Sequence, residues 1–246
     1  MDIKEFINSS SNDDVDNTES RKSLVDSFIN VHRHVNCAHG FADSLIMADY
    51  ILRNRHFSGN LFEFGCFEGG MSAKLSIVAS LINKKYCIYD TFTGLPQAAV
   101  YEAYDAKKAE LGIFKTGMFA STFENTKKNI ENYGKIESCD FFPGLVENTL
   151  NSFNEEVMFA FIDVDIVETA SFIVEKIWNH VTSHGIFTHE ACLKTYMQSF
   201  LNTNWWNIKF KQSPPLCYSR KLSPGKKQHG FDDAGCLDFI MKTDGY

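Results

Sequence analysis

The segment LFEFGCFEGG, residues 61–70, combines a carboxylate with a glycine-rich turn. Glu63 lies in an apolar, strand-like run, and Gly65, Gly69 and Gly70 follow it. Glycines without a Cβ let a ligand approach the backbone closely and tolerate positive φ. The spacing is not the G-x-G-x-x-G of a dinucleotide site. The carboxylate would repel a pyrophosphate, but it would attract a cation or accept hydrogen bonds from an amine or a hydroxyl.

A second acid, Asp90, ends the next apolar run, 21 residues after Gly69. In doubly wound sheets an acid at this place holds the hydroxyls of a ribose. A cofactor with a ribose and a positively charged, amino-acid-like end, and without a pyrophosphate, suits both Glu63 and Asp90. S-adenosylmethionine is such a cofactor. The alternative is a tight turn with a partly exposed glutamate and no ligand.

Three further residues with catalytic side chains end two later apolar runs. Asp163 ends VMFAFID, and His189 and Glu190 lie at the end of the run that begins at residue 185. Because the carboxyl ends of adjacent parallel strands meet at one edge of a sheet, we expect these three side chains to lie together beside the methyl group of the cofactor.

The segments that must position these residues alternate between strand-like apolar runs and apolar residues at helical spacing. Strand-like apolar runs are found at residues 61–64, 86–90, 135–142, 157–163 and 185–191. Helical spacing separates them at residues 69–83, 121–133 and 166–180. Strands of this kind, alternating with helices, predict an α/β fold with a doubly wound parallel sheet covered on both faces. Outside this core we predict helices at 41–53 and 101–110 and late strands at 206–212 and 236–242.

The chain is predicted to have an N-terminal arm with a helical lead-in, residues 1–34, and one catalytic domain, residues 35–246. Residues 1–20 are polar and acidic, which predicts a flexible or loosely docked arm. The long stretches 91–120 and 212–232 are expected to cover the carboxyl ends of the strands, where the first would close over the ligands.

The composition favours a cytoplasmic protein that acts on a small molecule. The 246 residues carry a net charge of −7, which argues against nucleic acid or an anionic membrane as a partner. The seven cysteines include no C-x-x-C pair, as expected for reduced thiols. The polar, acidic start is unlike a secretory signal, and no apolar run approaches the ~18 residues of a membrane span.

Four segments together resemble one enzyme family. EFGCFEGGMSAKL, YDTFTGLP, FFPGLVENTL and FIDVDIVETA are similar, in order and spacing, to motifs of the macrocin O-methyltransferase (TylF-type) family of class I S-adenosylmethionine-dependent enzymes. The likeness runs between residues 40 and 195. It implies a Rossmann-like class I methyltransferase fold with a mostly parallel sheet and an antiparallel last strand. It also implies methylation of a hydroxyl on a sugar, a glycosylated natural product or a surface glycan.

The resemblance also implies a set of site residues. The predicted cofactor-binding residues are Glu63, Gly65, Phe67, Gly69, Asp90, Thr91, Gly144 and Asp163. Glu63, Gly65 and Gly69 would line the methionine moiety, and Asp90 would bind the ribose. In the family, an aspartate that corresponds to Asp163 and two aspartates after the next strand hold a magnesium ion. This ion orients the acceptor hydroxyl and lowers its pKa.

The chain departs from the family at this acceptor site. Val164 replaces a glycine, and His189 and Glu190 replace the two aspartates. Glu190 still offers a hard oxygen, whereas an imidazole is a poor ligand for magnesium and a good one for manganese, iron or zinc. The favoured prediction is a divalent metal (magnesium, manganese or iron) held by Asp163, His189 and Glu190, with Asp163 and His189 as catalytic residues.

Other interpretations of the site stay open. Without a metal, His189 would be the general base, oriented by Asp163 or Glu190. Alternatively, these side chains make ordinary hydrogen bonds in a catalytically silent cofactor-binding protein. A nicotinamide-dependent oxidoreductase is disfavoured by the glycine pattern and Glu63. His39 could face the acceptor pocket, although a solvated polar turn is the simpler expectation for it. A homo-oligomer is also compatible with the sequence.

Overall fold

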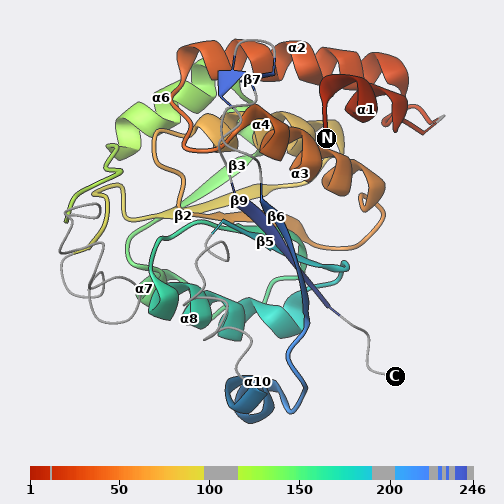
Figure 1. Ribbon diagram of the computed structural model, residues 1–246. Helices are drawn as coiled ribbons and strands as arrows, with labels where there is room; N and C mark the ends of the chain where they lie inside the picture. The colour runs from red at the N-terminus through yellow and green to blue at the C-terminus, as the bar shows by residue number, and fades with distance from the viewer. Residues whose placement is uncertain are drawn as a thin grey trace.

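The computed structural model describes residues 1–11, 13–96, 116–189, 203–221, 227–228, 231–232 and 236–242. Its centre is a seven-stranded sheet with the order β3-β2-β1-β4-β5-β9-β6, and β7 and β8 form a separate two-stranded ribbon (Figure 1). The ribbon consists of β7 (Lys227–Gln228) and β8 (Phe231–Asp232). The predicted helix at 101–110, Glu190, most of the stretch 91–120, and residues 222–226 and 229–230 of the stretch 212–232 lie outside the described residues.

Five parallel strands form the larger part of the sheet. They are β1 (Asn60–Phe64), β2 (Tyr86–Asp90), β3 (Cys139–Pro143), β4 (Val157–Ile162) and β5 (Gly185–Thr188). β9 (Cys236–Met241) is antiparallel both to β5 and to β6 (Leu216–Lys221). The sheet is therefore mostly parallel with an antiparallel last strand, which confirms the predicted Rossmann-like methyltransferase fold class.

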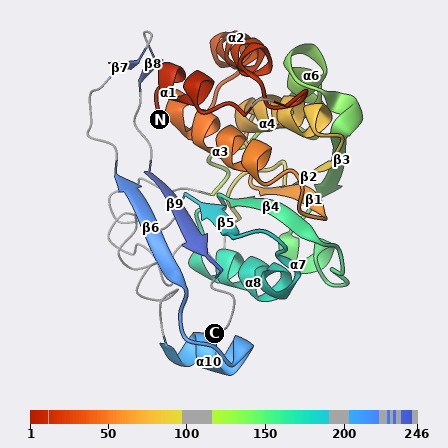
Figure 2. The ribbon, with the colours of Figure 1, turned by 90° about the vertical axis from the view of Figure 1, so that its right-hand side faces the viewer.

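Helices cover both faces of the sheet. On one face lie α1 (Ile3–Asn8), α2 (Thr18–His34), α3 (Phe41–Arg53), α4 (Gly70–Leu81) and α6 (Phe123–Tyr133) (Figures 1 and 2). The other face carries α7 (Val146–Thr149), α8 (Val167–Ile177) and α10 (Thr203–Phe210). Short 3₁₀ turns precede β3 (η2, Ile136–Ser138) and follow α8 (η3, Trp178–His180).

The alternation of side chains along β1 decides what lies beneath the glycine-rich turn. Leu61 packs in the core with α2, α3 and α4, whereas Phe62 and Phe64 pack with α8 on the opposite face. Because side chains alternate along a strand, Glu63 shares the face of Leu61. The carboxylate therefore enters the helical layer that contains α3 and α4, where it is 1% exposed.

The predicted strand at 206–212 is wrong, because this segment lies in α10. Trp206 and Phe210 are one helical turn apart, so a helix brings both rings to the same side. Their ring centroids are 4.8 Å apart, and Trp206 packs fully buried against Trp178 at 5.0 Å. Burial of these rings outweighs the strand propensity of the aromatic residues. The edge strand β6 was not predicted.

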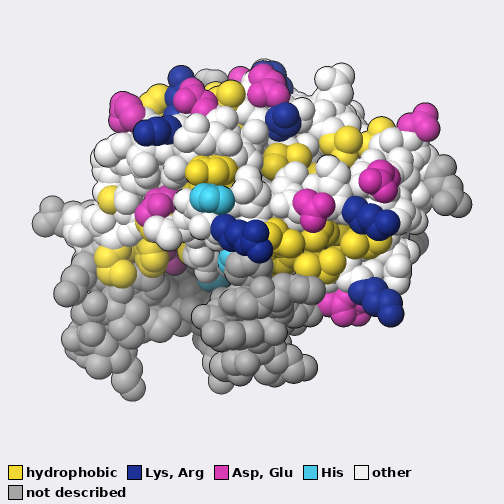
Figure 3. Space-filling model, turned by 90° about the horizontal axis from the view of Figure 1, so that it is seen from above, with side chains coloured by type: hydrophobic (Ala, Val, Ile, Leu, Met, Phe, Trp, Pro, Cys, Tyr) yellow, Lys and Arg dark blue, Asp and Glu magenta, His cyan; other side chains and the backbone are white. Residues whose placement is uncertain are grey.

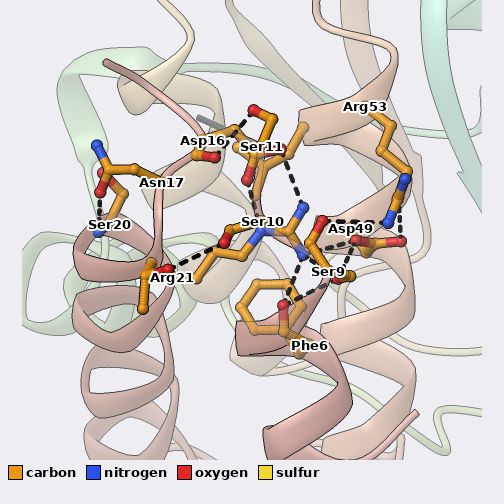
Figure 4. A network of polar contacts seen from close by, with 12 residues as sticks. Phe6, Ser9, Ser10, Ser11, Asp16, Asn17, Ser20, Arg21, Asp49 and Arg53 are labelled. Atoms are coloured by element: carbon orange, nitrogen blue, oxygen red, sulfur yellow. Dashed lines mark hydrogen bonds and ion pairs between the residues drawn. The ribbon is translucent and has the colours of Figure 1, made fainter. Parts of the chain in front are cut away.

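The N-terminal arm is docked, which corrects the expectation that residues 1–20 are loosely attached. Arg21 of α2 is fully buried, and its Nε donates to Asp16 Oδ1 at 2.5 Å (Figure 4). Its Nη1 donates to Asp49 Oδ1 of α3 at 2.6 Å and to the Phe6 carbonyl of α1 at 2.8 Å. One guanidinium thus joins three helices. The division of the chain at residue 34 stays a prediction.

The outer surface of this helical layer is mixed in charge. Figure 3, which views the molecule from above Figure 1, shows acidic and basic side chains interspersed over the described part of this face. Within the part of the chain that the structure describes, no helix has both the length and the apolar character needed to cross a membrane.

Replacement of Arg21 by Met should lower the free energy of unfolding by about 3–5 kcal/mol, because it leaves the buried Asp16 carboxylate without the guanidinium that it contacts at 2.5 Å. Arg53→Met is the matched control, since Arg53 also pairs with Asp49 (2.8 Å) but is 54% exposed. That control should cost at most about 1 kcal/mol. Urea unfolding of both variants measures the difference, and equal losses would show that the Arg21 network does not hold the arm.

Candidate active site

A cavity of about 650 Å³ lies at the carboxyl ends of the parallel strands. Its walls come from the turn after β1, the end of β2, the segment after β3, the segment after β4, and His189 after β5. Of the predicted cofactor-binding residues, the cavity is lined by Gly65, Phe67, Asp90, Thr91, Gly144 and Asp163. Among the described residues, Glu63 and Gly69 are not part of this lining.

The turn after β1 requires glycine for a steric reason. Gly65 has φ +88°, and a Cβ at this position would overlap the carbonyl oxygen of Asp163. The ends of β1 and β4 therefore approach each other more closely than any side chain would permit. Gly69 has φ +83° and is the N-cap residue directly before α4. These two glycines let the chain reverse from strand to helix within a few residues.

Asp90 is fixed by backbone amides at the mouth of the cavity. Its Oδ2 accepts from the Cys66 N–H and its Oδ1 from the Phe92 N–H, each at 2.7 Å. The Gly144 N–H donates to the Asp90 carbonyl at 2.9 Å, which connects the turn after β3 to the same point. The carboxylate is thus oriented before any ligand arrives. Its contact with a ribose stays a prediction.

Asp163 lies between two histidines. His39 Nε2 is 2.7 Å from Asp163 Oδ2, and His189 Nδ1 is 3.5 Å from Asp163 Oδ1. The two imidazole rings meet edge to face, with centroids 4.6 Å apart. The structure therefore brings the predicted residues Asp163 and His189 together, and it adds His39. We call these three side chains the Asp163 cluster.

His39 is a residue that, from the sequence, could face the acceptor pocket, although a solvated turn is the favoured expectation for it. It is 6% exposed, in the loop before α3, and its ring packs against Phe161 at 5.0 Å. The expectation of a solvated turn is wrong for this residue. Its contact with Asp163 joins positions 124 residues apart in the chain. The only signal in the sequence was its place directly before an amphipathic helix.

The charges of the Asp163 cluster follow from its burial. Burial alone lowers the pKa of His39, but the charge and hydrogen bond of Asp163 outweigh it and raise that pKa to about 10. Burial raises the pKa of Asp163, and the His39 charge more than reverses this, so that its pKa is lowered. Burial lowers the pKa of His189, and the positive His39 lowers it further, although Asp163 opposes both. At neutral pH, His39 is therefore a cation, Asp163 an anion and His189 a neutral imidazole.

Glu63 lies behind the glycine-rich turn. Ser72, in the first turn of α4, donates to Glu63 Oε2 at 2.5 Å. Burial raises the pKa of Glu63 to about 8, in spite of this hydrogen bond and the nearby His39 charge. Glu63 borders a second, small cavity together with His39 and Asp163. Contact between Glu63 and the methionine moiety of a cofactor stays a prediction.

The described residues do not assemble a metal-binding group. Among them, no three histidine, cysteine, aspartate or glutamate side chains are placed to hold one ion. Both oxygens of Asp163 already face a histidine, Oδ2 at 2.7 Å from His39 Nε2 and Oδ1 at 3.5 Å from His189 Nδ1. Glu190, the third predicted ligand, lies outside the described residues.

The comparisons with known proteins identify the family of the chain. The family model of macrocin O-methyltransferase (TylF) matches residues 44–198. The chain belongs to this family. It is an O-methyltransferase, as the four motifs predicted.

Solved structures share the fold of this O-methyltransferase. The O-methyltransferase NovP superposes with a TM-score of 0.64 at 14% identity, over 89% of this chain and 96% of NovP. The calicheamicin methyltransferase CalS11 gives a TM-score of 0.57 at 14% identity, over 97% of each chain. The methyltransferase PaMTH1 of Podospora anserina, solved with SAH, gives 0.51 at 11% identity, over 90% of this chain and 88% of PaMTH1. A search of curated proteins finds no match.

The His39–Asp163 pair should make the stability of the O-methyltransferase depend on pH. The folded-state pKa of His39, about 10, exceeds the ordinary value of 6.5, so the folded protein holds this proton more tightly than the unfolded chain. The stability advantage of the wild type over His39→Gln is therefore fully present below pH 6.5 and is lost as the pH rises through 10. Urea unfolding between pH 6 and 10 measures it.

The control for this experiment removes the cause of the shift. In an Asp163→Asn background, the effect of His39→Gln should no longer vary with pH in this window, because the carboxylate that raises the pKa is absent. A wild-type advantage that stays constant from pH 6 to 10 would contradict a charged His39.

Proposed function

We propose that this protein transfers the methyl group of S-adenosylmethionine to a hydroxyl oxygen of a sugar, on a glycosylated natural product or a glycan. The observation that carries the proposal is the single cavity in which the glycine-rich turn, Asp90 and the Asp163 cluster meet. Membership of the macrocin O-methyltransferase family supports it. So does the fold of CalS11, described as a TDP-rhamnose 3′-O-methyltransferase of calicheamicin biosynthesis, at a TM-score of 0.50.

In this proposal the cofactor lies along the carboxyl ends of β1, β2 and β3. Gly65 and Phe67 provide backbone against which the methionine moiety packs, and the preoriented Asp90 accepts hydrogen bonds from the ribose hydroxyls. Thr91 and Gly144 border the same region. The sulfonium methyl group then points toward Asp163 and His189, and the acceptor enters from that side.

The Asp163 cluster supplies the acid–base chemistry. The acceptor oxygen attacks the methyl carbon, the bond between carbon and sulfur breaks, and S-adenosylhomocysteine leaves with the electron pair. The proton of the acceptor hydroxyl passes to His189, whose lowered pKa keeps the imidazole neutral and able to act as a base. Asp163 orients His189 and stabilises the imidazolium that forms. Alignment of the two reacting atoms accounts for much of the rate.

The metal-dependent alternative, which the sequence favoured, finds no support in the described residues. Asp163 already faces His39 through one oxygen and His189 through the other. Among the described residues, no three histidine, cysteine, aspartate or glutamate side chains are placed around one point, so the proposed reaction is derived without a metal. His39 supplies the positive charge beside Asp163.

Asp163→Asn should abolish methyl transfer while leaving the affinity for S-adenosylhomocysteine nearly intact, because Asp163 acts on the acceptor side. Calorimetry should give micromolar binding of S-adenosylhomocysteine to both proteins and no binding of NAD or NADP. Release of S-adenosylhomocysteine in the presence of sugar acceptors measures turnover. Unchanged turnover in Asp163→Asn would remove this residue from the mechanism, and binding of NAD instead of S-adenosylhomocysteine would contradict the proposed cofactor.

Exhaustive chelation with EDTA should leave methyl transfer unchanged, since His189 and His39 perform the tasks that a metal would otherwise perform. Activity is measured before chelation, after it, and after addition of magnesium, manganese or iron. Loss of activity that manganese or iron restores better than magnesium would favour the site of Asp163, His189 and Glu190 instead.

A further inference from the structure

A second, small cavity lies behind the glycine-rich turn. It has a volume of about 10 Å³ and is bordered by the loop 36–39, by Glu63 and by the first residues of α4. It shares Gly65, Cys66, Phe67 and Asp163 with the lining of the large cavity. A cavity needs a volume of ~10–15 Å³ to hold one water molecule.

Two buried polar atoms on the border of this cavity lack a well-formed hydrogen bond. His39 Nδ1 and Glu63 Oε1 are both inaccessible to solvent, and neither makes such a bond among the described residues. The buried Tyr86 hydroxyl interacts with the Glu63 carboxylate, but it likewise makes no well-formed hydrogen bond there. The other polar atom of each side chain is engaged: His39 Nε2 with Asp163, and Glu63 Oε2 with Ser72. Leaving a buried polar atom unsatisfied costs ~1–3 kcal/mol. A water molecule needs two to four polar partners to remain in a buried site.

We propose that the small cavity holds one water molecule, bonded to both His39 Nδ1 and Glu63 Oε1, and that Glu63 is thereby a positioning residue for the Asp163 cluster. The water completes a chain of hydrogen bonds from Ser72 through Glu63 and His39 to Asp163. When both ring nitrogens are hydrogen-bonded, the His39 imidazole is fixed in one orientation. The hydrogen bond from His39 then fixes the position of the Asp163 carboxylate. The role of Glu63 in turnover rests on the proposed methyl transfer, whereas the water site itself does not.

The ammonium group of the cofactor is the rival occupant, since the sequence predicted that Glu63 lines the methionine moiety. The size of the cavity argues against it. Its volume is about 10 Å³, which suits one water molecule, whereas an ammonium group would bring the α-carbon of the cofactor with it. A water molecule can both donate and accept, so it can bond to His39 Nδ1 and to Glu63 Oε1.

The test combines crystallography with kinetics. In crystals of the wild type grown with S-adenosylhomocysteine, one water should lie within about 3 Å of both His39 Nδ1 and Glu63 Oε1. Glu63→Met, similar in length but apolar, should expel it, and Glu63→Gln, which keeps two polar arms, should retain it. Glu63→Met should lower kcat by up to about a hundredfold with little change in KM or in the affinity for S-adenosylhomocysteine. Glu63→Gln should recover most of the turnover.

The other possible results of this test contradict either the water site or the positioning role of Glu63. A small cavity that is dry, or that holds the ammonium group of the ligand, in the wild-type crystals overturns the water site even if Glu63→Met does not fold. If the wild-type crystals contain the water but both Glu63 variants turn over like the wild type, Glu63 is not a positioning residue. Failure of the wild type to transfer methyl groups would contradict the proposed function, and the crystal structures would still decide the water site.

Discussion

The contact between Asp163 and His39 is the interaction on which the rest of this site depends. It joins the end of β4 to the loop before α3, two segments that would otherwise meet only through packing. The His39 side chain is 5% exposed and that of Asp163 17%, so each charge relies largely on the other for its stabilisation. The position of His39 in turn requires α3 and α2 to be fixed. The Arg21 network, which ties α1, α2 and α3 together, is therefore part of what builds the site.

This interaction also changes the electrostatic character of the acceptor region. In the family that the sequence resembles, an ion provides positive charge beside the aspartate after the fourth strand. Here the positive charge belongs to a side chain of the protein, His39. That charge lowers the pKa of Asp163 against the effect of burial, whereas the pKa of His189 is lowered chiefly by burial and further by the His39 charge.

Much of the fold could be predicted from the sequence because it is recorded in local patterns. The apolar runs of β1, β2 and β4 and the helical spacing of α3 and α4 each lie within a short window. The meeting of Asp163 and His189 followed from the geometry of parallel strands. His39, by contrast, acquires its role from a residue far along the chain, and no local pattern marks it. α10 and the docked arm were missed because burial of Trp206 and Arg21 against distant partners outweighs local propensity.

The order of the strands has a consequence for how the chain assembles. β6 is bonded to the rest of the seven-stranded sheet through β9, which comes later in the sequence. β6 is therefore synthesised before β9, the strand that attaches it to the sheet. Until β9 enters between β5 and β6, the edge of β5 is uncovered and open to pairing with another chain. The completion of this sheet is thus a late, long-range event, and the interval before it is when the protein is most exposed to aggregation.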